Sequence, residues 1–280
     1  MIAAFLLAAG VSVAHGTIRH YELDAPELHD RHRAVRVYTP PDYDDPGSAS
    51  RRYPSIYLLH GWPGSEGNWP GLGRATVTAD SLIASGRIPP VVLVFPNGDG
   101  SGLLGRSLYM DAYDGSSNME LFVTRRLVGW VDSTFRTQAT PERRAVVGLS
   151  DGGTAAINLV LLHPDVFGAC GSHSADLRLR KGFGMGGVLG PEPGATRLLE
   201  SHSPLDYGPE LLPHAGHPVI YFDCGAQDES VGENREFDEL LSRLGVTHDY
   251  HEYPGTHDWK YWRAHLPGAL VAVTAHMHDE

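Results

Sequence analysis

The hydrophobic positions of this chain fall into short runs separated by polar and glycine-rich segments. Residues 55–59, 91–95, 145–147 and 219–222 are continuously apolar or nearly so, whereas residues 34–38 alternate apolar and polar side chains. Continuous runs are typical of strands buried on both faces of a mostly parallel sheet, and alternation is typical of a half-buried strand. The pattern therefore predicts a central sheet.

Helical periodicity fills the intervals between several of these runs. It covers residues 121–131, 154–162, 233–244 and 259–277. Strands that alternate with helices predict an α/β fold with a mostly parallel sheet and helices on both faces. No internal repeat is visible, and residues 17–280 are expected to form one domain.

Residues 174–218 break this rhythm, because they show little periodicity and include the glycine-rich stretch KGFGMGGVLGPEPG. A long irregular segment inside a compact domain is usually a functional loop or lid. The alternative is a disordered insertion. We expect a lid-like insertion at this position.

The first residues, 1–16, are apolar and rich in small side chains, and Ser12, Val13 and Ala14 resemble a signal cleavage site. The basic residues that begin a signal peptide are missing. A signal-like segment and an ordinary buried N-terminal segment both fit this pattern. Secretion and a cytoplasmic location therefore both stay open.

Charge and composition narrow the classes of partner. The chain has 280 residues, is 41% hydrophobic, and carries 22 basic against 34 acidic residues, a formal net charge of −12. An acidic surface repels phosphate backbones, which argues against nucleic-acid binding. No apolar stretch reaches the roughly 18 residues that suggest a membrane span. Composition leaves the oligomeric state undetermined.

Cysteine and histidine placement does not indicate a metal site or a disulfide framework. Cys170 and Cys224 each follow apolar, strand-like residues, so we expect two small buried core residues. His248 and His251 are three residues apart on an expected strand, which places their side chains on opposite faces. We therefore expect no metal ion and no cofactor.

The stretch VVGLSDGGTAA, residues 146–156, carries the main chemical signal. It matches G-x-S-x-G around Ser150, after a predicted strand and before a predicted helix. A serine on such a tight turn needs small neighbours, and Gly148 and Gly152 meet that need. Gly153 allows the helix to pack close to the strand. Ser150 is therefore a candidate nucleophile.

A nucleophilic serine needs a base, and the base needs an orienting acid. Asp228 follows the strand predicted around residues 219–222 and lies beyond its carboxyl end, where α/β folds place their sites. Asp223 is still inside that strand and is a weaker candidate, and Glu229 is expected to point elsewhere. His257 follows the next strand and a glycine turn, so we expect it to be the base.

Two backbone donors should bind the oxyanion. The N–H of Asp151, directly after Ser150, is one candidate, and the N–H of Trp62 in the loop after residues 55–59 is the other. Taken alone, the His60-Gly61 pair in that loop is typical of an ordinary turn.

Residues 100–105 spell G-x-G-x-x-G, but no helix pattern follows them as a dinucleotide site requires. The polar and aromatic residues 106–117 are instead interpreted as a loop near the site. Tyr109 and Asp111 on this loop are candidates for lining a substrate pocket, and a plain surface loop is the alternative.

These motifs together resemble the esterase D family of α/β-hydrolases, which includes S-formylglutathione hydrolases, feruloyl and acetyl-xylan esterases, and mycobacterial mycolyltransferases. The resemblance covers roughly residues 33–270 and rests on HGWPGSEGNW, GLSDGG, CGAQDE and YHEYPGTHDWKYW. It implies an α/β-hydrolase fold, the roles assigned above to Ser150, Asp228 and His257, and oxyanion donors at Trp62 and Asp151. It also implies a serine esterase that acts on a small-molecule ester through an acyl-enzyme.

Two other functions stay open. An acyltransferase on the same fold would replace water with an alcohol or sugar, and a non-catalytic binding protein would lack a working triad. One residue departs from the family: members often carry an uncharged residue after the serine, where this chain has Asp151. We expect its carboxylate to point to solvent along the helix N-terminus, where the helix dipole stabilises it.

Overall fold

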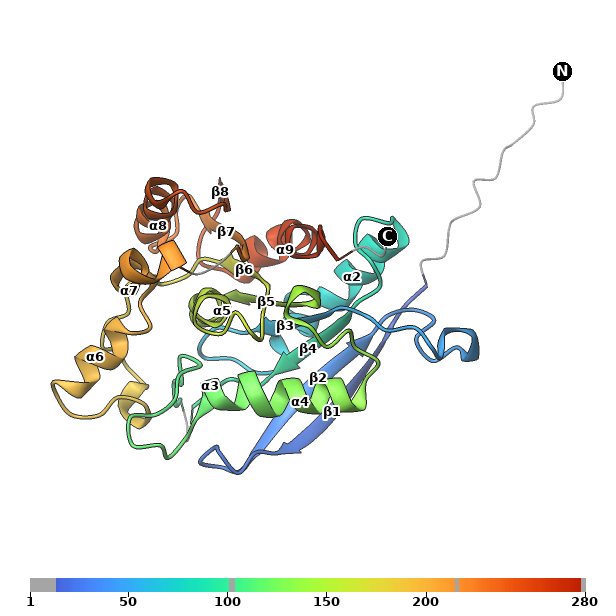
Figure 1. Ribbon diagram of the computed structural model, residues 1–280, viewed down its shortest axis with the longest axis horizontal. Coiled ribbons are helices and arrows are strands. Elements are labelled where there is room, and N and C mark those ends of the chain that lie inside the picture. The colour runs from blue at the N-terminus through green and yellow to red at the C-terminus, as the bar shows by residue number, and fades with distance from the viewer. Residues whose placement is uncertain (1–13, 101–103, 215–216, 278–280) are drawn as a thin grey trace, which may run out of the picture.

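An eight-stranded sheet runs through the middle of the molecule (Figure 1). The computed structural model describes residues 14–100, 104–214 and 217–277. The strands, in chain order, are β1 Thr17–Asp24, β2 His32–Thr39, β3 Ser55–Leu59, β4 Val92–Pro96, β5 Arg144–Leu149, β6 Ala169–His173, β7 Val219–Gly225 and β8 Asp249–Tyr253. Their order in the sheet is β1-β2-β4-β3-β5-β6-β7-β8. The β1–β2 and β2–β4 pairs are antiparallel, and every other neighbouring pair is parallel.

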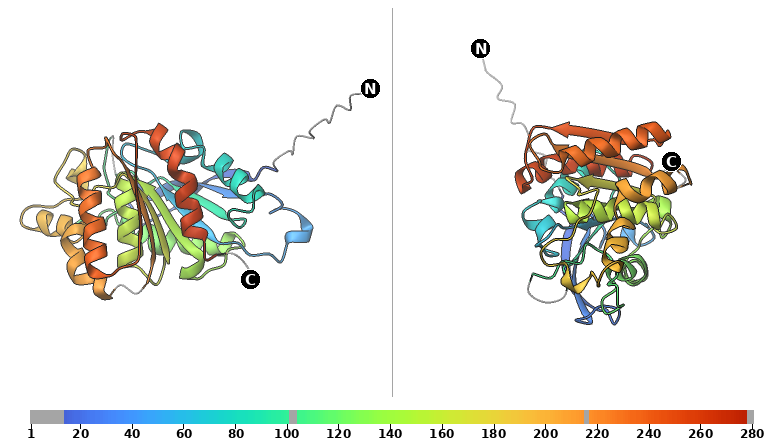
Figure 2. Two further views of the ribbon diagram at one scale, coloured as in Figure 1. Left: turned by 90° about the horizontal axis from the view of Figure 1, so that it is seen from above. Right: turned by 90° about the vertical axis from the view of Figure 1, so that its left-hand side faces the viewer.

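Helices cover both faces of this sheet (Figure 2). They are α1 Asn68–Gly71, α2 Ala75–Ala84, α3 Met119–Leu121, α4 Val128–Thr134, α5 Asp151–Leu162, α6 Gly194–Glu200, α7 Pro204–Leu211, α8 Val231–Leu244 and α9 Trp259–Thr274. Side chains of α4, α5 and α8 share one apolar core with the sheet. Those of α2 and α9 share the second core on the opposite face.

The continuous apolar runs are explained by these two cores. In β3, Tyr57 and Leu59 belong to one core, whereas Ile56 and Leu58 belong to the other. Successive side chains of a strand point to opposite faces, so a strand covered on both sides needs apolar residues at every position. The predicted α/β-hydrolase fold, with a mostly parallel sheet and helices on both faces, is confirmed.

Several elements of the body have no counterpart among the predicted elements, among them β1, β6, α1 and α2. Strand β1 is an edge strand with the sequence TIRHYELD, and Ile18 is exposed, so it carries no continuous apolar run. Strand β6 has the sequence ACGSH, in which small and polar residues are fully buried. Tertiary packing, rather than hydrophobicity, selects a strand at that position.

The insertion, residues 174–218, contains two short helices, α6 and α7, that the sequence analysis does not predict. Each helix is eight residues long or shorter, which is too brief to establish a helical period in the sequence. Met185, Val188 and Leu199 of this segment pack with Leu108 and Met110 in a third, smaller apolar cluster. This cluster attaches the insertion to the loop that precedes α3.

Parts of several sequence predictions lie outside the described residues: positions 1–13 of the N-terminal segment, 101–103 of the glycine-rich loop, 215–216 of the insertion, and 278–280 at the end of the predicted domain. Within the described ranges, none of the helices has the length and apolar character needed to span a bilayer.

Candidate active site

Ser150 occupies a sharp turn between β5 and α5. Its φ of 52° and ψ of −122° place it in a backbone conformation that residues other than glycine rarely adopt. The adjacent glycines are required by contact: a Cβ on Gly148 would lie 1.9 Å from the Gly152 carbonyl oxygen, and one on Gly152 would lie 2.4 Å from the Leu59 carbonyl oxygen. The local sequence therefore folds into a turn that presents the serine at the carboxyl edge of the sheet.

The loops after β7 and β8 bring an acid and a histidine to the same edge. These loops are bonded to each other, because the Gln227 N–H donates to the Gly255 carbonyl oxygen at 2.9 Å. His257 Nε2 lies 3.0 Å from Ser150 Oγ. Its Nδ1 lies 3.1 and 3.0 Å from the two carboxylate oxygens of Asp228. The structure thus aligns the three residues in one hydrogen-bonded chain.

Burial and hydrogen bonding shift the pKa of the Asp228 carboxyl in opposite directions. Burial raises the pKa of its carboxyl, but hydrogen bonds from His257 and from the Ser230 N–H, the latter at 2.9 Å, outweigh burial and hold the pKa below its ordinary value. Asp228 therefore remains an anion that fixes the Nδ1–H tautomer of His257.

Burial and the contact with Asp228 likewise shift the pKa of His257 in opposite directions. Burial lowers the pKa of its imidazole, but the hydrogen bond to Asp228 and the charge of that carboxylate raise the pKa above its ordinary value in total. The ring also packs edge-on against Trp262, with centroids 5.0 Å apart. The imidazole is thus oriented toward Ser150 and stabilised in the protonated form that follows proton abstraction.

Asp223, the weaker acid candidate, does not reach His257. Its carboxylate accepts a hydrogen bond from Tyr261 Oη at 2.9 Å and lies 2.9 Å from His173 Nδ1. All three residues are buried. Glu229 is exposed, and the carboxylate that meets the imidazole of His257 is that of Asp228. The structure therefore separates the two aspartates into different networks.

The loop after β3 approaches Ser150 closely at its backbone. A Cβ on Gly61 would lie 3.0 Å from the Ser150 Cβ and 3.3 Å from the Leu149 carbonyl oxygen, so a larger residue there would crowd the Ser150 turn. Within the described ranges, the backbone N–H groups of Trp62 and Asp151 have no hydrogen-bond acceptor. Two free donors next to a serine are the feature that an oxyanion requires.

His60 supports that loop from behind, a role that the sequence motif alone did not reveal. Its Nε2 accepts the Gly98 N–H at 2.8 Å, so Nδ1 carries the proton and donates to the Gly61 carbonyl oxygen at 2.8 Å. Burial lowers the pKa of His60 to about 4, which keeps it neutral and preserves this tautomer. The histidine thus couples the loop after β3 to the loop after β4.

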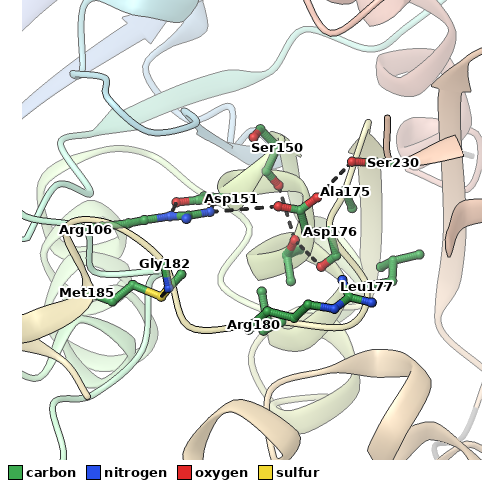
Figure 3. Close-up of polar contacts among 12 residues, drawn as sticks. Arg106, Ser150, Asp151, Ala175, Asp176, Leu177, Arg180, Gly182, Met185 and Ser230 are labelled. Carbon is green, nitrogen blue, oxygen red and sulfur yellow. Dashed lines mark hydrogen bonds and ion pairs between the residues drawn. The ribbon is translucent and has the colours of Figure 1, made fainter. Parts of the chain in front are cut away.

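Asp151 does not point to solvent, so that expectation is wrong. The residue is 3% exposed, and its carboxylate forms a bidentate ion pair with Arg106, whose Nε donates to Oδ2 at 2.6 Å and whose Nη2 contacts Oδ1 (Figure 3). Burial raises the pKa of Asp151, and the guanidinium offsets part of that rise. An ion pair that bridges 45 positions of sequence has no local signal.

Of the two candidates for a pocket wall, Tyr109 borders a small cavity together with Trp62 and Asp151. Tyr109 is 4% exposed and donates through Oη to the His60 carbonyl oxygen at 3.1 Å, so it braces the oxyanion loop from inside. Asp111 is half-buried and accepts the Leu121 N–H at 3.0 Å, which places its carboxylate at the start of a helix. Both side chains therefore have hydrogen-bond partners within the protein, and a contact of either with substrate stays a prediction.

The histidines and cysteines set aside above have separate surroundings. His248 Nε2 bonds Asp238 at 2.8 Å, and His251 Nε2 lies 2.9 Å from Asp249. Cys170 and Cys224 are both buried and unbridged. No three His, Cys, Asp or Glu side chains gather as metal ligands in the described ranges.

Known proteins resemble this chain in sequence and in fold. The model of the esterase family matches residues 26–273, nearly the whole chain. The chain belongs to this family. An esterase of Mycobacterium tuberculosis strain H37Rv is 28% identical to it over 267 residues, covering 85% of this chain and 56% of the relative. An endo-1,4-beta-xylanase/feruloyl esterase of Xylanibacter ruminicola is 27% identical over 257 residues, covering 90% of this chain and 30% of the relative.

This chain thus spans only part of the length of these two relatives, about half of the mycobacterial esterase. Among solved structures, a ferulic acid esterase superposes with a TM-score of 0.81 at 26% identity, covering 94% of this chain and 99% of the other. An S-formylglutathione hydrolase from Agrobacterium tumefaciens superposes with a TM-score of 0.75 at 17% identity, covering 94% and 97%. The second likeness is one of fold. The predicted family is confirmed by these findings.

Proposed function

We propose that this protein is a serine carboxylic-ester hydrolase in which Ser150 is the nucleophile, His257 the general base and Asp228 the orienting acid. The observation that carries the proposal is the continuous chain from Ser150 Oγ to His257 Nε2 at 3.0 Å and from His257 Nδ1 to Asp228 at 3.0 Å. Membership of the esterase family supports the same reaction class.

In the first half of the reaction, His257 Nε2 takes the proton of the Ser150 hydroxyl as Oγ bonds to the ester carbonyl carbon. The carbonyl oxygen becomes an oxyanion, and the N–H groups of Trp62 and Asp151 are assigned to bind it. Protonated His257 then donates its proton to the alcohol oxygen as the C–O bond breaks. The alcohol leaves, and the acyl group remains on Ser150.

In the second half, His257 takes a proton from a water molecule, whose oxygen attacks the acyl carbon. A second oxyanion forms at the same two N–H groups. The bond to Ser150 Oγ then breaks, Oγ regains the proton from His257, and the free acid leaves. Asp228 remains ionised throughout and stabilises the imidazolium formed in each half.

For the substrate we propose an ester with an aromatic acyl group. The similarity to a ferulic acid esterase and to a xylanase/feruloyl esterase supports this class. Two aromatic side chains of this protein also support an aromatic acyl group. Trp62 in the oxyanion loop and Phe183 of the insertion have ring centroids 6.0 Å apart. Phe183 is 72% exposed, which is unusual for a large apolar side chain and leaves its face available to a flat ligand.

The experiment compares wild type with Ser150→Ala on p-nitrophenyl acetate and on methyl ferulate. The variant loses one hydroxyl, so we expect a folded protein whose kcat falls by about 10⁶-fold. A fluorophosphonate probe should label wild type and not the variant. Equal release of acid and alcohol distinguishes hydrolysis from acyl transfer. If Ser150→Ala keeps near wild-type kcat, the nucleophile is elsewhere.

A further inference from the structure

The residue after the proposed nucleophile carries a buried carboxylate next to the turn where we propose that negative charge develops. Asp151 is assigned an oxyanion contact through its N–H, and its side chain is buried. Two negative charges repel strongly in a site that excludes water, so an unpaired carboxylate near the oxyanion would raise the energy of the transition state. The burial of Asp151 therefore requires a compensating charge.

Arg106 supplies that charge from a distant part of the chain. Its Nε donates to Asp151 Oδ2 at 2.6 Å, its Nη2 contacts Asp151 Oδ1, and the arginine side chain is itself only 16% exposed. A bidentate guanidinium–carboxylate pair is planar and rigid, which fixes both partners. Figure 3 shows Arg106 reaching toward the turn that carries Ser150 and Asp151.

The same guanidinium also contacts other parts of the site. It lies 5.6 Å from the centroid of the Trp62 ring, and its Nη2 is 3.9 Å from Asp176 Oδ2. The backbone N–H of Arg106 donates to the Gly184 carbonyl oxygen at 2.9 Å. One arginine thus touches both proposed oxyanion residues and the insertion.

We propose that Arg106 is a positioning residue of the oxyanion hole, which acts by neutralising the Asp151 carboxylate and by holding Trp62 beside it. This inference rests on the proposed ester hydrolysis at Ser150. It has a specific consequence: Arg106 matters for turnover only while residue 151 is charged. Removal of the carboxylate should therefore cancel much of the damage that loss of Arg106 causes.

The test is a double-mutant cycle with p-nitrophenyl acetate, a small neutral ester. Arg106→Met should lower kcat by about 10²-fold, the effect of losing one oxyanion donor, with KM changed only a few-fold. Asp151→Asn should stay within a few-fold of wild type, because Arg106 still faces Asp176. The double variant Arg106→Met/Asp151→Asn should recover to within a few-fold of Asp151→Asn.

Arg235→Met is the matched control. Arg235 pairs with Glu252 through the same two nitrogens, Nε at 2.8 Å and Nη2 at 2.7 Å, but on the surface between α8 and β8. The kcat of Arg235→Met should equal that of wild type. Arg106→Lys should keep the charge and retain most of the kcat, and it serves as the test if Arg106→Met does not fold by circular dichroism.

Three results would overturn the inference: a double variant no more active than Arg106→Met, a roughly tenfold rise in kcat for Asp151→Asn, or an Arg106→Lys as inactive as Arg106→Met. The proposed function fails separately. Absence of fluorophosphonate labelling at Ser150 in wild type would remove the esterase proposal itself, whereas normal labelling with a wild-type-like Arg106→Met would remove only the role of Arg106.

Discussion

Two of the histidine–aspartate pairs in the molecule, His257–Asp228 and His173–Asp223, have almost the same geometry in different surroundings. In each pair, Nδ1 of the ring faces a carboxylate: His257 meets Asp228 at 3.0 Å, and His173 meets Asp223 at 2.9 Å. The side chain of His257 is 29% exposed, whereas those of His173 and Asp223 are both 0% exposed. His257 Nε2 reaches Ser150 Oγ, but His173 Nε2 is buried without a partner among the described residues.

The difference comes from position along the strands. His173 and Asp223 are paired in register within β6 and β7, under cover of Tyr261 from α9. Asp228 and His257 lie in the loops beyond β7 and β8, at the edge where the Ser150 turn also lies. The dyad inside the sheet is buried away from solvent, whereas the one at the carboxyl edge lies where α/β folds bind their ligands. Geometry within a pair does not by itself identify a catalytic pair.

The largest difference between the two pairs is expected when each histidine is replaced by alanine. His257→Ala removes the base, and we expect kcat to fall by about 10⁶-fold with little change in thermal stability. His173→Ala leaves the buried Asp223 without its nitrogen partner and should cost about 3–5 kcal/mol of unfolding free energy. Urea unfolding and steady-state kinetics on both variants measure the two effects. A stable, inactive His173→Ala would contradict the division of roles.

The two aspartates give the next largest contrast. Asp228→Asn should lower kcat by about 10⁴-fold, because the amide no longer holds the reactive tautomer of His257. Asp223→Asn keeps one acceptor for Tyr261 and should cost about 1–3 kcal/mol of stability while kcat stays within a few-fold. The same two assays apply. A stable Asp223→Asn that loses turnover as Asp228→Asn does would place the acid inside the strand.

The pH profile sharpens the assignment of the exposed pair. His257 must be neutral to accept a proton, so kcat/KM should rise with pH as the imidazole loses its charge. Asp228 raises the pKa of His257 above its ordinary value, so the midpoint should lie above about 6.5. The residual activity of Asp228→Asn should show a lower midpoint. A flat profile between about pH 5 and 9, with chemistry rate-limiting, would exclude His257 as the base.

The smallest effect is expected at Phe183, which we propose contacts the acyl group of the substrate at the His257–Asp228 site. The buried His173–Asp223 pair has no such substrate-facing residue in this proposal. Phe183→Ala should raise KM for methyl ferulate a few-fold through lost ring contact and leave p-nitrophenyl acetate unchanged. Stability should change by less than about 0.5 kcal/mol, because the side chain is 72% exposed. Equal changes on both esters would mean that Phe183 does not contact the acyl group.

Much of the fold and of the catalytic constellation follows from local sequence. The turn at Ser150 requires Gly148 and Gly152, because any Cβ there would overlap backbone atoms, and this steric rule is visible as G-x-S-x-G. Strands buried on both faces require continuous apolar runs. The positions of Asp228 and His257 follow from chain order, since each residue comes a few positions after a strand that ends at the same edge of a parallel sheet.

Contacts between distant segments were decided by tertiary structure. No sequence pattern near Asp151 predicts its contact with Arg106, which lies 45 positions earlier. Because Arg106 pairs with it, the Asp151 carboxylate is buried rather than exposed to solvent. Tyr109 is buried under the oxyanion loop for the same kind of reason. Local sequence restricts backbone conformation and the burial pattern of each element. The packing of elements on the sheet determines which charges meet, and here it makes one of two similar histidine–aspartate pairs a candidate catalytic centre and the other part of the core.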